Sequence, residues 1–308
     1  MKLTGLHHIT MITGDAQHNV AFYADLLGLR LVKKTVNFDA PEAYHLYFGD
    51  EQGTPGTILT WFEFAGARAG RPGVGMIHTL QLGVASAAAL DFWAQRLAAA
   101  GCEAERDGDR LRFEDYDGLS LELVVATDDA PLRAAHPEVP AEHAITGLVG
   151  ARAYSAYEHV EESVLTDVLG FTYEGGGEYV LEGSERRFRW AYDDAPPLRG
   201  AQGAGSVHHI AWGSRDEDHL AWQERIGAAG GYVTDVRDRD YFLSIYFQEP
   251  RGVLFEIATL SPGFAVDEDP EHLGEELRLP TQHEHLRSQL ERTLQPVVNP
   301  RAARRVTA

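Results

Sequence analysis

The chain has 308 residues, 44% of them hydrophobic, and carries 47 acidic against 27 basic residues for a formal charge of −20. This is the composition of a folded globular protein, and its negative charge excludes nucleic acid and anionic membrane surfaces as natural partners. The single cysteine, Cys102, excludes an intramolecular disulfide and a thiolate metal site, and without a secretory h-region or a membrane-length apolar run we expect a cytoplasmic protein.

The first elements in chain order are a strand, a helix and three further strands. The strand is Leu6-His7-His8-Ile9-Thr10, and Asp15 is placed to cap a helix over residues 16–27 that Gly28 ends. Apolar and β-branched runs then predict strands over residues 29–32, 44–49 and 57–64.

The same order of elements returns three times along the chain. The second module is predicted as a strand over 77–84, a helix from Ser86 to residue 100, and strands over 110–113 and 119–125. The third has strands over 147–154, 179–182 and 187–192 and a helix over about 158–169. The fourth begins at His208, has its helix between Ser214 and Gly230, and ends with strands over 241–247 and 253–258.

Short echoes between the modules indicate a duplication. Residues 25–29 (DLLGL) resemble residues 167–171 (DVLGF), and residues 99–101 and 228–230 both read AAG. We therefore expect an N-terminal half over residues 1–140, a C-terminal half over 141–262 and an extension over 263–308. In the extension we expect an acidic loop at 267–270, a helix over 281–294 and a frayed basic tail at 301–305.

Comparison of equivalent module positions gives a candidate metal site. The fourth module has His209 and Glu256, and the first has His8 but carries Thr60 where the fourth has its glutamate. The third has no histidine at this position. Two histidines and one carboxylate can form a facial triad with open coordination positions, and here that set requires modules one and four to share a sheet.

The second module keeps His78 and Glu122 but offers no third ligand. We interpret these two as a vestigial pair at best, and a polar pair in a solvated cleft is the favoured account. For the main triad, a histidine taken singly is more often a hydrogen-bonded core or surface residue, and Glu256 could simply pair with an arginine. Recurrence at equivalent repeat positions favours the metal site.

The predicted fold is therefore α+β, with four βαβββ modules forming two curved mixed half-barrels and helices outside. Modules one and four form one half-barrel, and modules two and three form the other. Tyr246, upstream of Glu256 across a turn, is placed to become its cross-strand neighbour, although tyrosine is equally common as a packing residue.

These features resemble the vicinal oxygen chelate superfamily, which includes glyoxalases, bleomycin-resistance proteins and extradiol dioxygenases, and more closely its hydroquinone-type ring-cleaving dioxygenases. The resemblance covers nearly the whole chain and is carried by residues 6–10, 14–17, 31–35, 44–50, 53–57, 207–211, 238–239, 246, 252–256 and 267–269. It is specific at both ends of the chain and weak in modules two and three.

The resemblance implies Fe(II), or less often Mn(II), bound by His8, His209 and Glu256, and cleavage of a hydroquinone- or catechol-type ring with O2. It also implies catalytic or supporting roles for His7, Thr10, His208, Arg239 and Tyr246. Tyr246 and His208 are the candidates for proton delivery and Arg239 for holding anionic charge. By strand alternation alone, Thr10 shares the face of His8, whereas His7 and His208 point away.

Two other functions remain open at this stage. A glyoxalase-type isomerase or lyase would bring a second carboxylate to the metal, and Thr60 at that position speaks against it. A small-molecule-binding protein of the same fold without enzymatic activity would need no triad. Ring substituents, the native metal and the oligomeric state stay open, with a homo-oligomer as one option.

Overall fold

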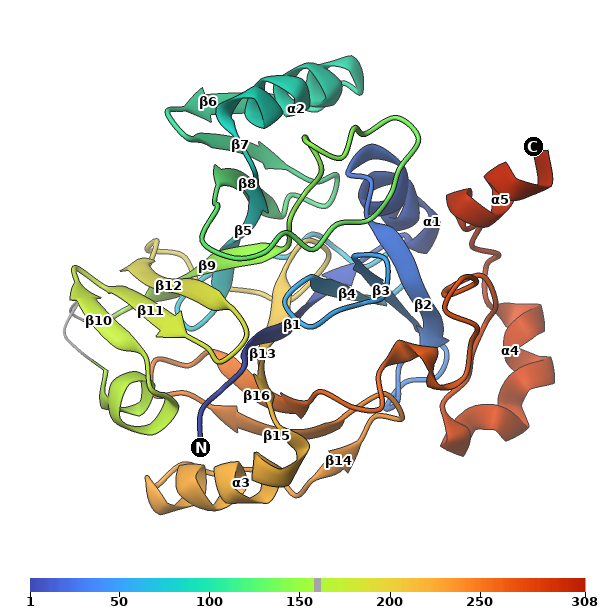
Figure 1. The fold of residues 1–308 in the computed structure, drawn as a ribbon. Helices are drawn as coiled ribbons and strands as arrows, with labels where there is room; N and C mark the ends of the chain where they lie inside the picture. Colours follow the sequence, from blue (N-terminus) through green and yellow to red (C-terminus); the bar gives the residue numbers. More distant parts are fainter. Residues whose placement is uncertain (158–161, 308) are drawn as a thin grey trace.

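Two eight-stranded mixed sheets build the protein, as seen in a computed structural model that describes residues 1–157 and 162–307 (Figure 1). Each sheet takes one module from the first half of the chain and one from the second. The predicted α+β fold and the predicted pairing of modules are therefore confirmed. No helix in the described part of the chain is long and apolar enough to cross a membrane.

The first sheet has the strand order β14-β15-β16-β13-β1-β4-β3-β2. Module one supplies its elements β1 (Gly5–Thr13), α1 (Ala16–Val20), the π-helical η1 (Ala21–Leu26), β2 (Arg30–Val36), β3 (Tyr44–Gly49) and β4 (Ile58–Glu63). Module four supplies β13 (Val207–Ser214), η3 (Asp216–Asp218), α3 (His219–Ala228), β14 (Arg237–Asp238), β15 (Leu243–Gln248) and β16 (Leu254–Thr259). The central antiparallel pair, β1 with β13, joins the two modules.

The second sheet repeats this plan in the order β10-β11-β12-β9-β5-β8-β7-β6. Module two supplies β5 (Ile77–Val84), α2 (Ala87–Ala99), β6 (Ala104–Asp107), β7 (Arg110–Glu114) and β8 (Ser120–Val125). Module three supplies β9 (Leu148–Ser155), η2 (Val164–Leu169), β10 (Thr172–Gly175), β11 (Glu178–Glu182) and β12 (Arg187–Asp194). Here β5 and β9 form the central antiparallel pair.

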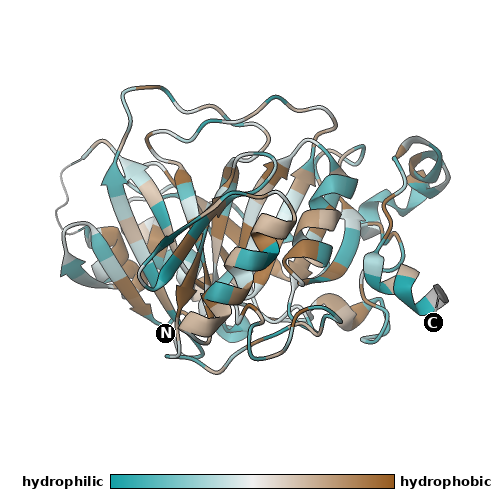
Figure 2. Ribbon diagram, turned by 90° about the horizontal axis from the view of Figure 1, so that it is seen from above, coloured by the Kyte–Doolittle hydropathy of each residue, from teal (hydrophilic) through white to brown (hydrophobic). Residues whose placement is uncertain are grey.

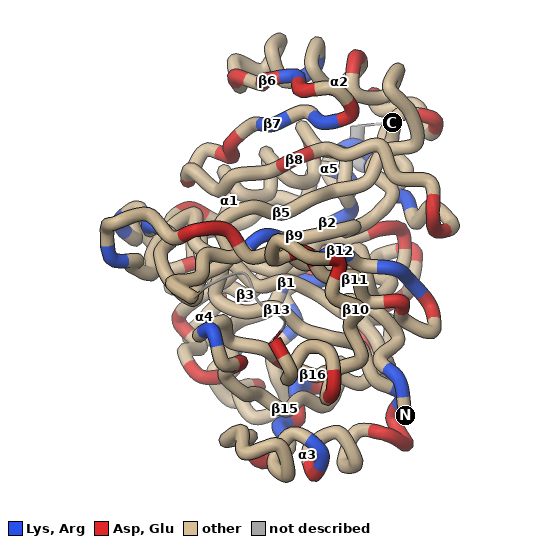
Figure 3. Tube along the Cα trace, turned by 90° about the vertical axis from the view of Figure 1, so that its left-hand side faces the viewer, with Lys and Arg blue, Asp and Glu red and all other residues tan. Residues whose placement is uncertain are grey.

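Buried apolar side chains connect the two sheets into one core. Trp212 of β13 packs edge-on against Trp190 and Phe188 of β12, with ring centroids 6.2 and 5.4 Å apart. Hydrophobic and hydrophilic residues are interspersed along the strands (Figure 2), and the central strands β1 and β13 are buried along nearly their whole length. Lys, Arg, Asp and Glu follow outer elements such as α3 and β6, whereas β1 and β13 contain none (Figure 3).

Two of the predicted helix starts are confirmed by their caps. The Asp15 carboxylate accepts a hydrogen bond from the His18 amide, and the Ser86 hydroxyl accepts one from the Ala89 amide. The predicted helix over 158–169 lies partly at residues 158–161, outside the described residues, and its remainder is the π-helical η2. The strands β6, β10 and β14 were not predicted, because they are short and largely polar edge strands.

The C-terminal extension packs beside β2 and the first module (Figure 1). It contains η4 (Phe264–Val266), η5 (Thr281–Leu286), α4 (Arg287–Thr293) and α5 (Pro300–Thr307). The helix predicted over 281–294 is thus a 3-10 turn followed by a short α-helix. The prediction of a frayed tail was wrong: α5 is helical, and Arg301, Arg304 and Arg305 form ion pairs with Glu51, Asp25 and Glu275.

Candidate metal centre and its cavity

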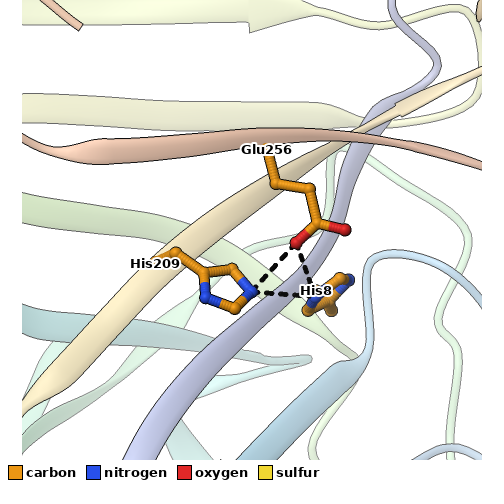
Figure 4. Close-up of side chains that lie close together, drawn as sticks. All are labelled: His8, His209 and Glu256. Atoms are coloured by element: carbon orange, nitrogen blue, oxygen red, sulfur yellow. Dashed lines mark hydrogen bonds and ion pairs between the residues drawn. The ribbon is translucent and has the colours of Figure 1, made fainter. Parts of the chain in front are cut away.

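The three predicted metal ligands converge in the first sheet. His8 Nε2 and His209 Nε2 lie 3.4 and 2.9 Å from the same oxygen, Glu256 Oε2, and 3.4 Å from each other (Figure 4). All three residues are buried, and theirs is the one group of three or more candidate ligand side chains found among the described residues. Cis ligands about 2.1 Å from one ion are roughly 3 Å apart, so this spacing fits a facial triad.

Strand pairing explains how residues distant in the sequence meet. Glu256 of β16 lies opposite Ala211 of β13, which lies opposite His8 of β1, so these residues form one row across three strands. His209 lies two rows away, opposite Thr10, with Ile9 and Ile210 in the row between. The triad is therefore a product of the register between modules one and four.

The donor atoms have the chemistry that a cation requires. Glu256 Oε2 is buried without a hydrogen-bond donor, while Ser244 donates to the other carboxylate oxygen, Oε1. Burial alone would raise the pKa of Glu256, but His8 and His209 hold it well below its usual range. Burial also lowers the pKa of His209, with Glu256 opposing that shift. A buried carboxylate facing two imidazoles fits a divalent cation with a 2-His-1-carboxylate ligand set.

The outer nitrogen of each ligand histidine meets the histidine that precedes it. His7 Nδ1 lies 2.8 Å from His8 Nδ1, and His208 Nδ1 lies 2.8 Å from His209 Nδ1. Burial is the main cause that lowers the pKa of His7 to about 3 and that of His208 to about 4, so both rings are neutral at pH 7. A neutral ring can accept the Nδ1–H of its neighbour, which leaves Nε2 of that neighbour free for a metal.

Two β-bulges bring His7 and His208 to this position. The register between β1 and β13 shifts between Leu6 and His8, which leaves His7 unpaired. It shifts again at Thr10 and Met11, which leaves His208 unpaired on β13. A bulge re-aims side chains that simple alternation would direct to the other face, so the expectation that both rings point away from the ligands was wrong.

A cavity of about 350 Å³ opens beside the ligand atoms. The predicted residues Thr10, His208, Arg239 and Tyr246 line it together with His8 and His209, whereas His7 does not and instead packs against Phe242. The other lining residues are mainly aromatic or apolar: Phe38, Ala40, Phe62, Phe64, Phe242 and Leu254, with Asn37, Asp39, His45 and Tyr47. The site is a mostly apolar pocket with a few convergent polar groups, the form of a small-molecule site.

Tyr246 and Arg239 form a pair on one wall of the cavity. Tyr246 of β15 lies directly opposite Glu256 of β16, as predicted. Its hydroxyl accepts a hydrogen bond of 3.2 Å from Arg239 Nε. Arg239 also stacks over Phe38 and lies 3.5 Å from Asp39. Burial and Glu256 raise the pKa of Tyr246 while Arg239 opposes them, so the phenol keeps its proton at neutral pH.

His45 and Tyr47 also face the cavity, and sequence reasoning assigned neither of them a role. Both lie on β3, two residues apart and therefore on the same face of the strand. That spacing was the available signal, but β3 is buried along its whole length and reads as core.

The second sheet has no equivalent centre within the described residues. His78 binds Asp193 at 2.9 Å and stacks on Tyr154, whereas Glu122 pairs with Gln81, Arg110 and Arg112. The two residues thus have separate partners and do not form a vestigial pair. Their partners satisfy them without a metal.

Comparison with known proteins reveals clear relatives. A sequence profile of the Glyoxalase/Bleomycin resistance protein/Dioxygenase superfamily matches residues 5–123 and 163–257. A Bacillus subtilis protein that carries the name of a ring-cleaving dioxygenase, MhqO, is 44% identical over 96% of this chain and 97% of its own. Chlorohydroquinone/hydroquinone 1,2-dioxygenase of Sphingobium indicum is 35% identical over 96% of this chain and 98% of its own. The crystal structure of a Bacillus subtilis protein, also named for a dioxygenase activity, has a TM-score of 0.89 at 43% identity and covers 97% of this chain and 98% of that one.

Proposed function

Since the chain belongs to the glyoxalase/bleomycin resistance protein/dioxygenase superfamily and its relatives at 35–44% identity are named ring-cleaving dioxygenases, we propose that it cleaves the ring of a hydroquinone- or catechol-type diol with O2 at an Fe(II) centre. The observation that carries the proposal is the triad of His8, His209 and Glu256, whose Oε2 has no hydrogen-bond donor, at the wall of an aromatic cavity.

Fe(II) is the proposed metal, with Mn(II) as the less frequent choice, because two imidazoles and one carboxylate with open positions suit non-haem oxygen chemistry. When bound, the metal supplies a site where a ring oxygen and O2 meet and exchange electrons. His7 and His208 hold the two ligand imidazoles by their outer nitrogens, so that both Nε2 atoms face the ion.

Other side chains of the cavity act on the substrate. The Tyr246 hydroxyl accepts from Arg239, which holds the phenol on the cavity wall as a proton donor toward the reacting ring. His208, whose Nδ1 faces His209, has its other ring nitrogen available as a second donor. Arg239 is the one arginine or lysine among the described cavity residues, and it is placed to hold anionic charge that develops on the substrate.

The shape of the cavity supports a small aromatic substrate. A volume of about 350 Å³ holds a single substituted ring together with O2 and little more. Phe38, Phe62 and Phe242 offer apolar faces for the ring. A cytoplasmic location, expected from the sequence, completes the proposal, while the oligomeric state and the ring substituents stay open.

The test is anaerobic loading with Fe(II), followed by oxygen uptake with a panel of hydroquinones and catechols. The wild type should take up O2 with a member of this panel and yield a ring-opened product. Glu256→Gln should lose both bound iron and uptake. Glu122→Gln, the same change at a buried glutamate of the second sheet, should retain both.

The two alternatives give different results in the same assay. Turnover that needs no oxygen would favour a glyoxalase-type isomerase. Such an enzyme would bring a second carboxylate to the metal from the position of Thr60. Thr60 lies opposite Thr10 in module one as Glu256 lies opposite Ala211 in module four, but its side chain is not a carboxylate. A protein without bound metal and without turnover would favour a small-molecule-binding role. Either result would overturn the dioxygenase proposal.

A further inference from the structure

We propose that His45 is a positioning residue of the cavity, which fixes the direction of a hydrogen-bond chain so that the Thr10 hydroxyl donates into the cavity beside the metal ligands. This inference rests on the proposed function, because the acceptor it implies is an oxygen of the substrate ring. It assigns to His45, Tyr47 and Thr60 a task that is separate from metal binding.

Three hydrogen bonds link the four residues of the chain across three strands. Tyr47 Oη lies 2.9 Å from His45 Nδ1, and His45 Nε2 lies 2.8 Å from Thr60 Oγ1. Thr60 then donates a 3.0 Å hydrogen bond to Thr10 Oγ1. Thr10, at the end of the chain, lies opposite His209 on the neighbouring strand and lines the cavity.

Proton counting gives the chain one direction. Within the described residues, the Tyr47 hydroxyl has His45 as its one hydrogen-bond partner, and the donation from Thr60 to Thr10 is already directed. If Tyr47 donates to Nδ1, then Nε2–H of His45 donates to Thr60, and Thr60 donates to Thr10. Thr10 has then accepted, and its own proton is left for an acceptor in the cavity. The opposite direction would require Thr60 to donate to His45 Nε2, but Thr60 has one hydroxyl proton and donates it to Thr10.

The surroundings keep His45 neutral and in place. The ring packs between Tyr47 and Phe62, with centroids 4.1 and 4.5 Å away, and its residue is 7% exposed. Burial is the first cause that lowers the pKa of His45 well below its usual value, and His8, His209 and Arg239 lower it further. A neutral imidazole carries one N–H, so it accepts a hydrogen bond at one nitrogen and donates one at the other. The donor at the Tyr47 end therefore fixes which groups donate in the rest of the chain.

This arrangement selects for an acceptor at one point of the cavity. A ring oxygen that has lost its proton, or whose proton points elsewhere, can accept from Thr10, whereas a ring group that offers only N–H or C–H cannot. Sites that use a buried hydrogen-bond donor discriminate strongly against ligands that leave it unpaired.

The first experiment measures hydroquinone binding to the Fe(II)-loaded protein without oxygen. Thr10→Val and His45→Leu should each weaken binding by about ten-fold, the size expected for one hydrogen bond to a charged or polarised oxygen. The double variant should lose less than about two-fold beyond either single variant, because both changes remove the same donor. Losses that multiply would overturn the proposal.

Conservative variants separate positioning from packing. The amide of His45→Gln can accept from Tyr47 through its oxygen and donate to Thr60 through its nitrogen, so binding should return to within about three-fold of the wild type. Tyr47→Phe should weaken binding, whereas Tyr44→Phe, which removes a hydroxyl bonded to the Gln295 carbonyl, should not. A glutamine variant as poor as the leucine variant would contradict a role in hydrogen-bond direction.

A second readout does not depend on the enzyme reaction. Nitrogen-15 NMR of labelled histidine in the metal-free protein, with His45→Gln for assignment, should show His45 as the neutral Nε2–H form. The Nδ1–H form would overturn the proposal. If the wild type bound no hydroquinone or catechol, the proposed function would fail, and this spectrum would still decide the direction of the chain.

Discussion

Tyr246 lies directly across from Glu256 on the neighbouring strands β15 and β16, and its hydroxyl accepts from Arg239 at 3.2 Å. The phenol is thus held beside the candidate metal site without being one of its three candidate ligands. Its role can therefore be separated from metal binding by substitution.

Tyr246→Phe should lower kcat by about 100-fold, because it removes a positioned proton donor while leaving the triad intact. Iron affinity, measured by anaerobic titration, should stay within about two-fold of the wild type. Tyr44→Phe provides the control for a lost hydroxyl elsewhere in the same sheet. Unchanged kcat, or loss of iron together with activity, would exclude this role for Tyr246.

His7 does not line the cavity, yet its Nδ1 lies 2.8 Å from His8 Nδ1. His7→Phe should therefore weaken Fe(II) affinity by about 10–100-fold, the usual cost of removing the outer partner of a metal-binding histidine. His285→Ala, at an exposed histidine of the extension, is the matched control. If metal affinity is unchanged in His7→Phe, the packing of His8 alone must orient its ring.

The module pairing and the triad could be predicted because both follow from patterns with a fixed period. A repeated order of elements locates equivalent positions, and His8, His209 and Glu256 are the chemistry-bearing residues left at those positions in modules one and four. The cross-strand placement of Tyr246 followed from the same register argument. The superfamily resemblance is confirmed by the sequence profile and by relatives that span nearly the whole chain.

Three other features of the fold and site could not be predicted, because each interrupts or lacks a regular sequence pattern. A bulge inserts one residue and reverses the alternation beyond it, so the positions of His7 and His208 could not be derived from spacing. The edge strand β6 is exposed at every residue and has no apolar periodicity to detect. The tail helix α5 makes ion pairs such as that of Arg301 with Glu51, which lies 250 residues away in the sequence and could not be matched to it from local pattern.

The extension is anchored to β2 by a charge cluster around a buried lysine. Lys33 is fully buried and pairs with both Asp267 and Glu268 of the acidic loop. Lys33→Met should lower the free energy of unfolding by about 3 kcal/mol in urea titrations, because Glu268 stays buried and keeps only the more distant Arg278, 3.9 Å away, as a cationic partner. Lys2→Met, at an exposed lysine, should change it by less than about 0.5 kcal/mol.

A second substitution tests that explanation. Adding Glu268→Gln to Lys33→Met removes the buried carboxylate charge that has lost its lysine partner and should recover part of the lost stability. The comparison needs the free energy of unfolding of Glu268→Gln alone. If Glu268→Gln lowers stability by the same amount in the Lys33→Met background as in the wild type, the two changes act independently. Charge compensation is then not the reason that Lys33→Met is less stable.

Asp115 should make stability depend on pH in the mildly acidic range. It is buried, and it accepts hydrogen bonds from the Tyr23 hydroxyl and from the amides of Asp117 and Leu119. Burial raises the pKa of Asp115 to about 6 from an ordinary value of 3.8, with those hydrogen bonds opposing the shift and the Asp117 charge adding to it. The folded state therefore binds this proton more tightly than the unfolded chain.

The sign follows from that difference. The contribution of Asp115 to stability is fully present below about pH 3.8 and is lost as pH rises through about 6, with a total change of about 3 kcal/mol. Asp115→Asn cannot titrate, so its stability relative to the wild type should rise by about that amount between pH 4 and pH 7 in urea unfolding. Asp109→Asn, at an exposed position, should give a curve parallel to the wild type. A parallel curve for Asp115→Asn as well would mean that Asp115 is ionised throughout this range in the folded protein.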